Sequence, residues 1–402
     1  MIAVALAVTF LVSAANKSGL VDRAAALAAR GETAEARHLL ERLVTSSNPA
    51  ALFVLACIEL DEQRFERASG LAQRLAAVRP GAPEAVVLAR LIEERKRAPD
   101  DRWTDVAVRA WSASGRPAAK PLLGTLDSHR PIDRAALAPA QRPGDKLLLE
   151  FGRDQQGSAD LTEAALAEAN AAERPLGVHL VAMHVLVNEA VPQEKRLLAR
   201  RVALDSLARV ARSHPEDGYL SSGVVLLQSD AQAPLTGPDL DSLEEALKRK
   251  TFALPIRPLY DAFEAVYEQV DPGQAQSRAF FETTRALPLE IHLALSRRAA
   301  ATADPALRDR AAAVLTTAGS RLEAGATFLD RMIGLSLQKK GAEIRGDASA
   351  MATVRMKRAY LTELMSKGRA FWQYQWPIAS LWRDHFVRNI TDEVRYHELM
   401  SR

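Results

Sequence analysis

The sequence predicts an all-α protein: a helical-hairpin solenoid followed by a larger antiparallel helical array. Three observations lead to this fold class. Apolar residues recur at the spacing of one-sided helices along most of the chain, strand-like alternation is nearly absent, and a helix-turn-helix pattern is written twice between residues 31 and 80. With 402 residues, of which 48% are apolar, the chain is long enough for two domains or one long solenoid.

Residues 1–15 form an uncharged apolar run that is too short to span a bilayer comfortably. The run ends in Ser13-Ala14-Ala15, the small residues that signal-peptide cleavage requires. We therefore expect a signal peptide or a short membrane anchor, and a periplasmic, extracytoplasmic or membrane-anchored protein. Because no basic residue precedes the run while Lys17 and Arg23 follow it, a buried first helix in a cytoplasmic protein is the alternative.

Residues 20–111 contain the repeated pattern. Its two copies cover residues 31–49 and 63–80, and Ala36 and Ala68 hold the same position 32 residues apart. Apolar residues at i, i+3, i+4 and i+7 predict five helices between residues 20 and 97, and a short helix around residues 103–111.

This stretch resembles the tetratricopeptide-repeat superfamily. The matching residues are Gly31, Ala36, Leu40 and Pro49 in one copy, and Leu55, Ala56, Phe65, Ala68 and Pro80 in the other. The period is shorter than the 34 residues of that family. Glu59 stands where an aromatic residue is usual, and Arg23 where a leucine is usual. The resemblance implies antiparallel helix pairs and the binding of another protein or peptide.

Residues 112–158 are rich in proline and glycine, which disfavour helices, and we expect a linker there. Residues 159–402 then form an all-helical domain with an aromatic and basic C-terminal segment. Candidate N-terminal caps include Asp241, three residues before a Glu, and Asp304, which precedes a Pro. The predicted helices lie near residues 160–173, 175–190, 193–213, 239–250, 257–270, 273–286, 288–302, 305–318, 321–340 and 348–370.

Signatures of catalysis are missing from the sequence. The single cysteine, Cys57, lies in an apolar run, so neither an intramolecular disulfide nor a cysteine metal cluster is possible, and we expect a buried, inert thiol. His179 and His184 would lie about 140° apart around a helix, which does not suit a shared metal ion. Asp127-Ser128-His129 is better explained as a turn than as a triad. We assign no catalytic residue, cofactor or metal ligand, and favour a protein that is not an enzyme.

The C-terminal segment has the most unusual composition, with three of the five tryptophans within residues 371–396. Its candidate functional residues are Trp372, Tyr374, Trp376, Trp382, Arg383 and Phe386. The favoured interpretation is a cap that covers the open end of the helical array. The second is contact with a partner protein or a membrane surface. Nucleic-acid binding is least favoured, because residues 331–402 carry only 13 basic against 7 acidic residues.

The function that these observations favour is a non-catalytic protein–protein interaction or scaffold protein. One alternative is an enzyme or small-molecule-binding protein with a pocket between the helices of residues 160–370. Another is a structural subunit that assembles through its aromatic C-terminus. The sequence specifies neither the partner nor the oligomeric state.

Overall fold

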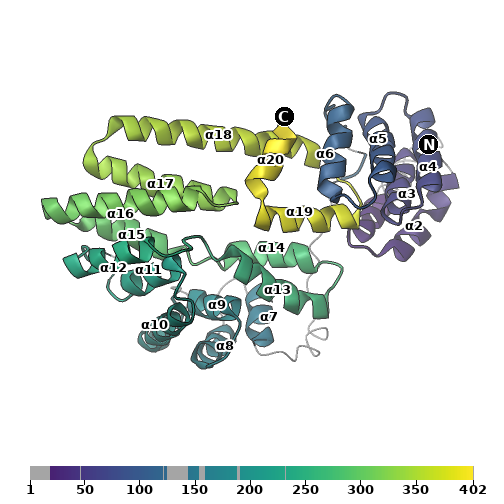
Figure 1. Ribbon diagram of the computed structural model, residues 1–402. Helices are drawn as coiled ribbons and strands as arrows, with labels where there is room; N and C mark the ends of the chain where they lie inside the picture. Colours follow the sequence, from purple (N-terminus) through teal and green to yellow (C-terminus); the bar gives the residue numbers. More distant parts are fainter. Residues whose placement is uncertain are drawn as a thin grey trace, which may run out of the picture. The chain divides into compact units, whose positions relative to one another are not determined.

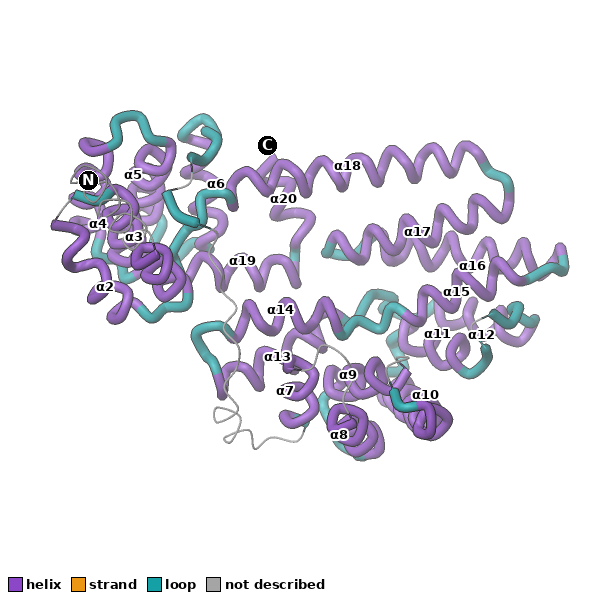
Figure 2. Tube along the Cα trace, turned by 180° about the vertical axis from the view of Figure 1, so that it is seen from behind, coloured by secondary structure: helices purple, strands orange, loops and turns teal. Residues whose placement is uncertain are grey.

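The computed structural model describes residues 19–45, 47–120, 122–124, 144–153, 159–187, 191–230 and 232–401. Within these ranges every regular element is helical, and the recorded β-type contact is an isolated bridge between Asp217 and Thr251 (Figure 2). The predicted all-α class is therefore confirmed. Residues 1–15, most of segment 112–158 and the turn at 127–129 lie outside the described residues, so the expectations for them stay predictions.

The chain divides into two compact units. Unit 1 contains residues 1–130, 364–388 and 395–402, and unit 2 contains residues 131–363 and 389–394. The sequence placed the aromatic C-terminal segment in the domain that starts at residue 159, whereas the structure groups most of it with the N-terminal helices. The physical reason is that its large aromatic side chains complete the hydrophobic core of unit 1.

Unit 1 begins with a row of helices in which α2 to α6 each pack against the next (Figure 1). The repeated alanines Ala36 and Ala68 are completely buried, so both copies of the repeat use a small residue where neighbouring elements meet. The five helices predicted between residues 20 and 97 are confirmed. The row consists of a helix at residues 19–29, α2 (Thr33–Thr45), α3 (Pro49–Asp61), α4 (Phe65–Val78), α5 (Pro83–Arg97) and α6 (Trp103–Ala113).

Helix α3 lies at the centre of the core of unit 1. Asn48 caps it by accepting a hydrogen bond from the backbone N–H of Ala51 at 3.0 Å, and Pro49 fills the first turn. Nine of its 13 residues are buried, many more than a single apolar stripe would provide. Other parts of the chain must therefore cover the helix on several sides.

Unit 2 is built from the later helices, most of which pack against their neighbours in sequence. Residues 223–227, the most strand-like stretch of the sequence, lie in a helix that the sequence analysis did not predict, α11. The elements are α7 (Asp145–Arg153), α8 (Ala159–Asn170), α9 (Leu176–Val187), η2 (Gln193–Lys195), α10 (Arg196–Ser213), α11 (Gly218–Leu227), α12 (Gly237–Leu247), α13 (Ile256–Val270), α14 (Ala275–Arg285), α15 (Glu290–Ala301), α16 (Pro305–Glu323), α17 (Phe328–Arg345) and the first part of α18 (Ala348–Trp372).

Glycines set the close packing of α16 on α17, which run side by side in Figures 1 and 2. The sequence predicted a break near Gly319, and that prediction is wrong, because α16 continues to Glu323. A Cβ atom on Gly319 would lie 2.5 Å from the carbonyl oxygen of Gly334, and a Cβ on Gly334 would lie 2.5 Å from the backbone nitrogen of Glu323. Gly319 therefore permits helix contact instead of ending the helix.

The predicted caps have different outcomes. Asp304 begins α16 as expected and accepts a hydrogen bond from the N–H of Leu307 at 2.9 Å. The cap predicted at Asp241 is wrong, because α12 begins one turn earlier. There Thr236 and Asp239 form the reciprocal capping box, with the N–H of Thr236 donating to Asp239 at 3.0 Å.

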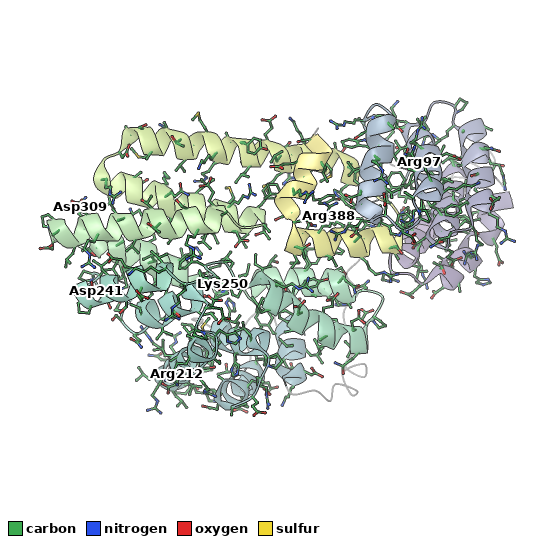
Figure 3. All side chains as sticks on the ribbon, in the orientation of Figure 1. Arg97, Arg212, Asp241, Lys250, Asp309 and Arg388 are labelled. Atoms are coloured by element: carbon green, nitrogen blue, oxygen red, sulfur yellow. The ribbon has the colours of Figure 1, made fainter. Side chains whose placement is uncertain are left out.

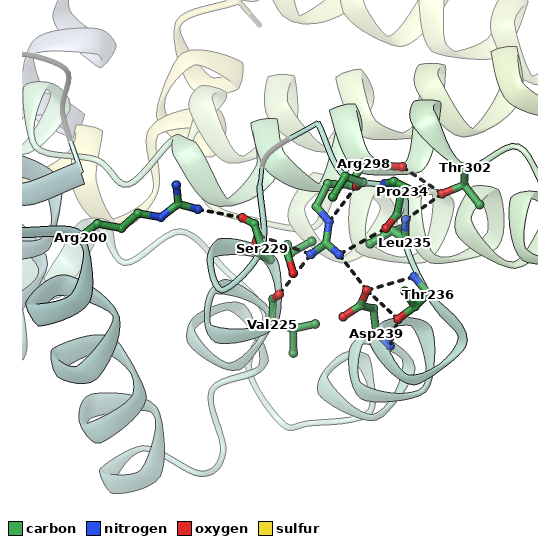
Figure 4. Close-up of polar contacts among 11 residues, drawn as sticks. Arg200, Val225, Ser229, Pro234, Leu235, Thr236, Asp239, Arg298 and Thr302 are labelled. Carbon is green, nitrogen blue, oxygen red and sulfur yellow. Dashed lines mark hydrogen bonds and ion pairs between the residues drawn. The ribbon is translucent and has the colours of Figure 1, made fainter. Parts of the chain in front are cut away.

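Arg298 on α15 joins this cap to the end of α11 (Figure 4). Its side chain is only 1% exposed, and it donates to the carbonyl oxygens of Ala233 at 3.1 Å and Val225 at 3.2 Å and to Asp239 at 2.7 Å. Burial raises the pKa of Asp239, but hydrogen bonds from Thr236 and the charge of Arg298 more than offset this effect and leave the pKa below its ordinary value. The guanidinium thus donates hydrogen bonds to backbone carbonyl groups at and after the end of α11, which lack a partner within a helix.

Other arginines of unit 2 act in the same way at other helix ends. Arg209 donates to the carbonyl oxygens of Ala171 at 2.8 Å and Ala169 at 3.1 Å, where α8 ends. Arg321 donates to those of Arg249 at 2.6 Å and Lys250 at 2.9 Å, just after α12. Because the C-terminal end of a helix carries partial negative charge, a cation is the favourable partner for these carbonyls.

We predict that Arg298→Ala lowers the free energy of unfolding of unit 2 by about 3–5 kcal/mol, because it leaves buried acceptors unpaired. Arg298→Lys should recover only part of the loss, since one ammonium group cannot reach acceptors on several sides. Urea unfolding followed by circular dichroism measures the effect. Arg308→Ala, at an exposed position, is the matched control, and equal losses in the two alanine variants would contradict the role of Arg298.

Glu393 closes another helix end within unit 2. Its carboxylate accepts a hydrogen bond from the N–H of Phe328 at 2.7 Å, in the first turn of α17. Burial raises the pKa of Glu393 to about 7, an effect that this hydrogen bond only partly opposes and that the charge of Asp330 reinforces. Burial also raises the pKa of Glu282 to about 7.

These raised pKa values contribute a loss of stability as the pH rises from about 4.5 to about 7, because Glu393 and Glu282 keep a proton in the folded state that they have lost in the unfolded chain. Buried histidines such as His292, whose pKa is lowered to about 4, contribute in the opposite direction over the same range. Glu393→Gln should remove the contribution of Glu393, so the stability at pH 7.5 relative to that at pH 5 should be higher in the variant than in the natural protein. Thermal unfolding at pH 5 and pH 7.5 tests this. The prediction is wrong if the difference in melting temperature between the two pH values is the same in the variant and the natural protein.

Candidate functional site

The candidate residues lie in a segment of unit 1 that we call the C-terminal strap, residues 371–388. It comprises the end of α18, a connection that is not helical at residues 375–378, and most of α19 (Ala379–Thr391). Trp376 and Tyr374 are 0% and 1% exposed, and Phe386 is also buried. Trp372 and Trp382 are half-buried, and Arg383 is exposed. Three of the six candidate side chains therefore lie in the interior of unit 1.

Trp376 is the largest side chain that the strap contributes to the core. Its ring centroid lies 5.6 Å from that of Phe53 on α3 and 5.2 Å from that of Tyr374. Phe371 extends the cluster to Trp111 on α6, with ring centroids 5.8 Å apart. The strap thus covers the sides of α3 and α6 that the other hairpin helices leave open, which accounts for the burial of α3.

The hydroxyl group of Tyr374 is held by a hydrogen bond. Its hydroxyl donates to the carbonyl oxygen of Pro117 at 2.7 Å. Burial, with the nearby charge of Glu84, raises the pKa of Tyr374 to about 12, so the hydroxyl keeps its proton and acts as a donor at neutral pH.

Two carboxylates join the strap to the N-terminal helices, because each caps the N-terminus of a helix on the opposite side of the contact. Asp61, at the end of α3, accepts from the backbone N–H groups of Ala379 at 3.0 Å and Ser380 at 3.4 Å, which begin α19. In the opposite direction, Asp384 on α19 accepts hydrogen bonds from Thr104, which lies in the first turn of α6. The backbone N–H of Thr104 donates at 2.9 Å and its hydroxyl donates at 2.6 Å. Each carboxylate therefore caps a helix on the other side of the contact.

Arg388 closes the far end of the strap (Figure 3). Its side chain is 3% exposed; it pairs with Asp105 and donates to the hydroxyl of Thr104 at 3.2 Å. The guanidinium carbon lies 4.7 Å from the centre of the Tyr396 ring on α20 (Glu393–Ser401). The charge is thus paired and stacked, as a buried arginine requires.

The half-buried tryptophans form a second aromatic cluster. The indole N–H of Trp382 donates to the carbonyl oxygen of Trp376 at 2.7 Å. The ring centroid of His385 lies 3.9 Å from that of Trp372. Burial, together with His397, lowers the pKa of His385 to about 3, so the imidazole is neutral at physiological pH and serves as a packing surface.

The sequence analysis did not identify Asp61, Thr104 or Asp384 as parts of this site. The only available signal for Asp61 was an acidic residue that directly follows a long apolar run. Capping rules look for partners three residues away, whereas Asp61 and Asp384 bond to residues 318 and 280 positions away. No local pattern encodes such a pairing.

The remaining residues considered from the sequence lie in separate surroundings. Cys57 is buried as expected, and burial, with Asp61, raises the pKa of its thiol well above the ordinary value. The Nδ1 atom of His179 lies 3.0 Å from the hydroxyl of Ser206, and that of His184 lies 3.6 Å from Glu290. No group of three or more potential metal ligands occurs among the described residues.

Unit 2 contains a cavity of about 850 Å³ beside the first turn of α9, the end of α10 and α13. His179 forms part of its wall, and burial and the charges of Arg209 and Arg174 lower the pKa of this histidine. Its other polar lining groups include Asp145, Arg174, Arg209 and Asp261. Acids and bases occur on the same wall, so the cavity has no clear preference for the charge of a ligand.

We predict that Asp384→Ala destabilises unit 1 by about 2 kcal/mol, because the first turn of α6 loses its cap. All five tryptophans lie in unit 1, so the unfolding of this unit can be followed separately by tryptophan fluorescence. Asp100→Ala, at an exposed position of the same unit, is the control. An Asp384→Ala curve that coincides with the control curve would contradict the role of the carboxylate.

In the described part of the chain, no helix combines the length and apolarity needed to cross a membrane. Comparison with known proteins gives no family model that matches the sequence, and no significantly similar curated protein or solved structure.

Proposed function

We propose that the protein is a non-catalytic interaction protein, in which the hairpin helices of unit 1 hold segments of polypeptide. The observation that carries the proposal is the strap itself. A non-helical aromatic stretch, Tyr374 to Ile378, lies against α3 with its large side chains buried, and two carboxylate caps fix α19, which follows it. Arrays of helical repeats use their concave surfaces for binding.

The strap also limits where a partner binds. Because Trp376 is completely buried and belongs to the core, a partner that replaced it would have to compensate for the loss of a large aromatic side chain. We therefore place the partner on the exposed surface of α4 and α5. This surface carries exposed valines, Val78 at 43% and Val86 at 48%, together with the exposed cations Arg67 and Arg90.

The partner that fits this surface is a protein or peptide with acidic and apolar side chains, because the exposed cations of α4 and α5 outnumber their exposed acids, Glu66 and Glu93. These cations are Arg67, Arg74, Arg90, Lys96 and Arg97. The apolar run at residues 1–15 supports a location outside the cytoplasm or at the cell envelope. The proposal requires neither a cofactor nor a catalytic residue.

Site-specific photo-crosslinking in the whole chain tests the proposal. A crosslinking residue at position 67 or 90 should capture one protein species, and excess unlabelled protein should compete for it. The same residue at position 306, exposed in unit 2, is the matched control and should capture nothing specific. An absence of adducts at positions 67 and 90, or the same adducts at all three positions, would overturn the proposal.

A further inference from the structure

Unit 2 carries a second hollow, which we call the arginine groove, between α9, α10, α11 and α15. Its volume is about 520 Å³. The floor is made of apolar side chains from all four helices, including Met183, Leu207, Leu226 and Ala294. A hollow of this size and lining suits a small apolar group.

The rim of the groove is rich in cations. Arg196 donates to the carbonyl oxygen of Val191 at 3.1 Å, and Arg200 donates to that of Ser229 at 2.9 Å. Arg297 also lines the groove; it is exposed, and among the described residues it has no recorded ion pair or side-chain hydrogen bond. Because the described part of the chain gives Arg297 no partner, this cation is available to a ligand.

The two acids of the rim do not cancel this charge. Asp230 accepts a hydrogen bond from the N–H of Gln232 at 2.8 Å, and Glu290 lies 3.6 Å from the imidazole of His184. Neither partner neutralises its carboxylate, because one is a backbone N–H and burial lowers the pKa of His184. Three arginines therefore face two carboxylates. The rim thus carries one net positive charge, and Arg297 is the arginine for which the described residues provide no partner.

Exposed leucines lie beside these cations. Leu293, one helical turn before Arg297, is 42% exposed. Leu197 is 87% exposed and lines a smaller adjoining hollow, which shares Arg200 and Leu204 with the groove. Large apolar side chains left in water next to an unpaired cation indicate a ligand that has both a hydrocarbon part and a negative head.

We infer that the arginine groove binds a single-chain anionic amphiphile from solution, such as a fatty acid. The hydrocarbon chain lies on the leucine floor, where removing apolar surface from water stabilises the complex. The carboxylate lies at Arg297, which can donate two parallel hydrogen bonds to it. This inference does not depend on the partner-binding surface of unit 1, because every residue that carries it lies in unit 2.

An anionic phospholipid in a bilayer offers a similar combination of chain and charge. The groove is concave and its floor is lined by buried residues such as Leu207 and Ala294, at 2% exposure each. A flat membrane surface would contact the exposed leucines and leave this floor empty. We therefore commit to a monomeric amphiphile as the occupant.

Titration calorimetry on the whole chain tests the inference with three probes that share one chain: dodecanoate, dodecanol and dodecyltrimethylammonium. Dodecanoate should bind with one molecule per chain, dodecanol at least about tenfold more weakly, and the ammonium compound not at all. Equal affinity for all three would overturn the inference. So would binding to vesicles of phosphatidylglycerol without binding of monomeric dodecanoate.

Variants locate the site. Arg297→Gln should weaken dodecanoate binding about tenfold and leave dodecanol unchanged, because it removes only the contact with the head group. Leu293→Gln should weaken both, because it removes part of the apolar surface. Arg308→Gln, an exposed arginine outside the groove, is the control for charge. All three side chains are at least partly exposed, so folding is expected to persist, and circular dichroism checks it. If Arg297→Gln binds dodecanoate like Arg308→Gln, the assignment is wrong.

Discussion

The structure depends on pairing the backbone polar groups at helix ends that lie away from water, and the buried guanidinium of Arg298 is one group that does so. A fold made of helices leaves unpaired carbonyl and amide groups at every helix end, and packing the helices together hides many of these ends from water. In unit 2, arginines from one helix reach the final carbonyls of others, as Arg298, Arg209 and Arg321 do. These side chains satisfy the acceptors and also join helices that are distant in sequence, so end-capping and tertiary contact are achieved by the same groups.

Unit 1 meets the same constraint at the opposite helix ends. Asp61 and Asp384 supply carboxylates to the N-termini of α19 and α6, where the helix dipole favours negative charge. Each of these carboxylates caps a helix on the other side of the contact. The strap therefore stabilises the start of α6, and α3 stabilises the start of α19 in the strap. The aromatic core around Trp376 provides the burial, and the carboxylates determine where along the helices the strap lies. Apolar burial alone would allow the strap to shift, since it has little directionality.

The two proposed activities place different demands on the chain. A hairpin array that already holds part of its own polypeptide needs a second surface for a partner, and the exposed face of α4 and α5 provides one. The arginine groove needs the opposite arrangement, a hollow that the described residues leave open, with no partner for Arg297 among them. The two features lie in different units, so interaction with a protein and binding of an amphiphile can be lost independently.

The sequence alone determined the helical class, the repeat around Ala36 and Ala68, and the burial of Cys57, because helix periodicity and apolar runs are local properties. It also singled out the aromatic C-terminus, although it left open whether these residues cover the core or contact a partner. Only the tertiary structure decided that Trp376 packs on Phe53 and that Asp384 caps α6. It also showed that Gly319 allows α16 to approach α17 where a break was expected. These features depend on residues far apart in the chain, and a local pattern has no means of specifying such distant partners.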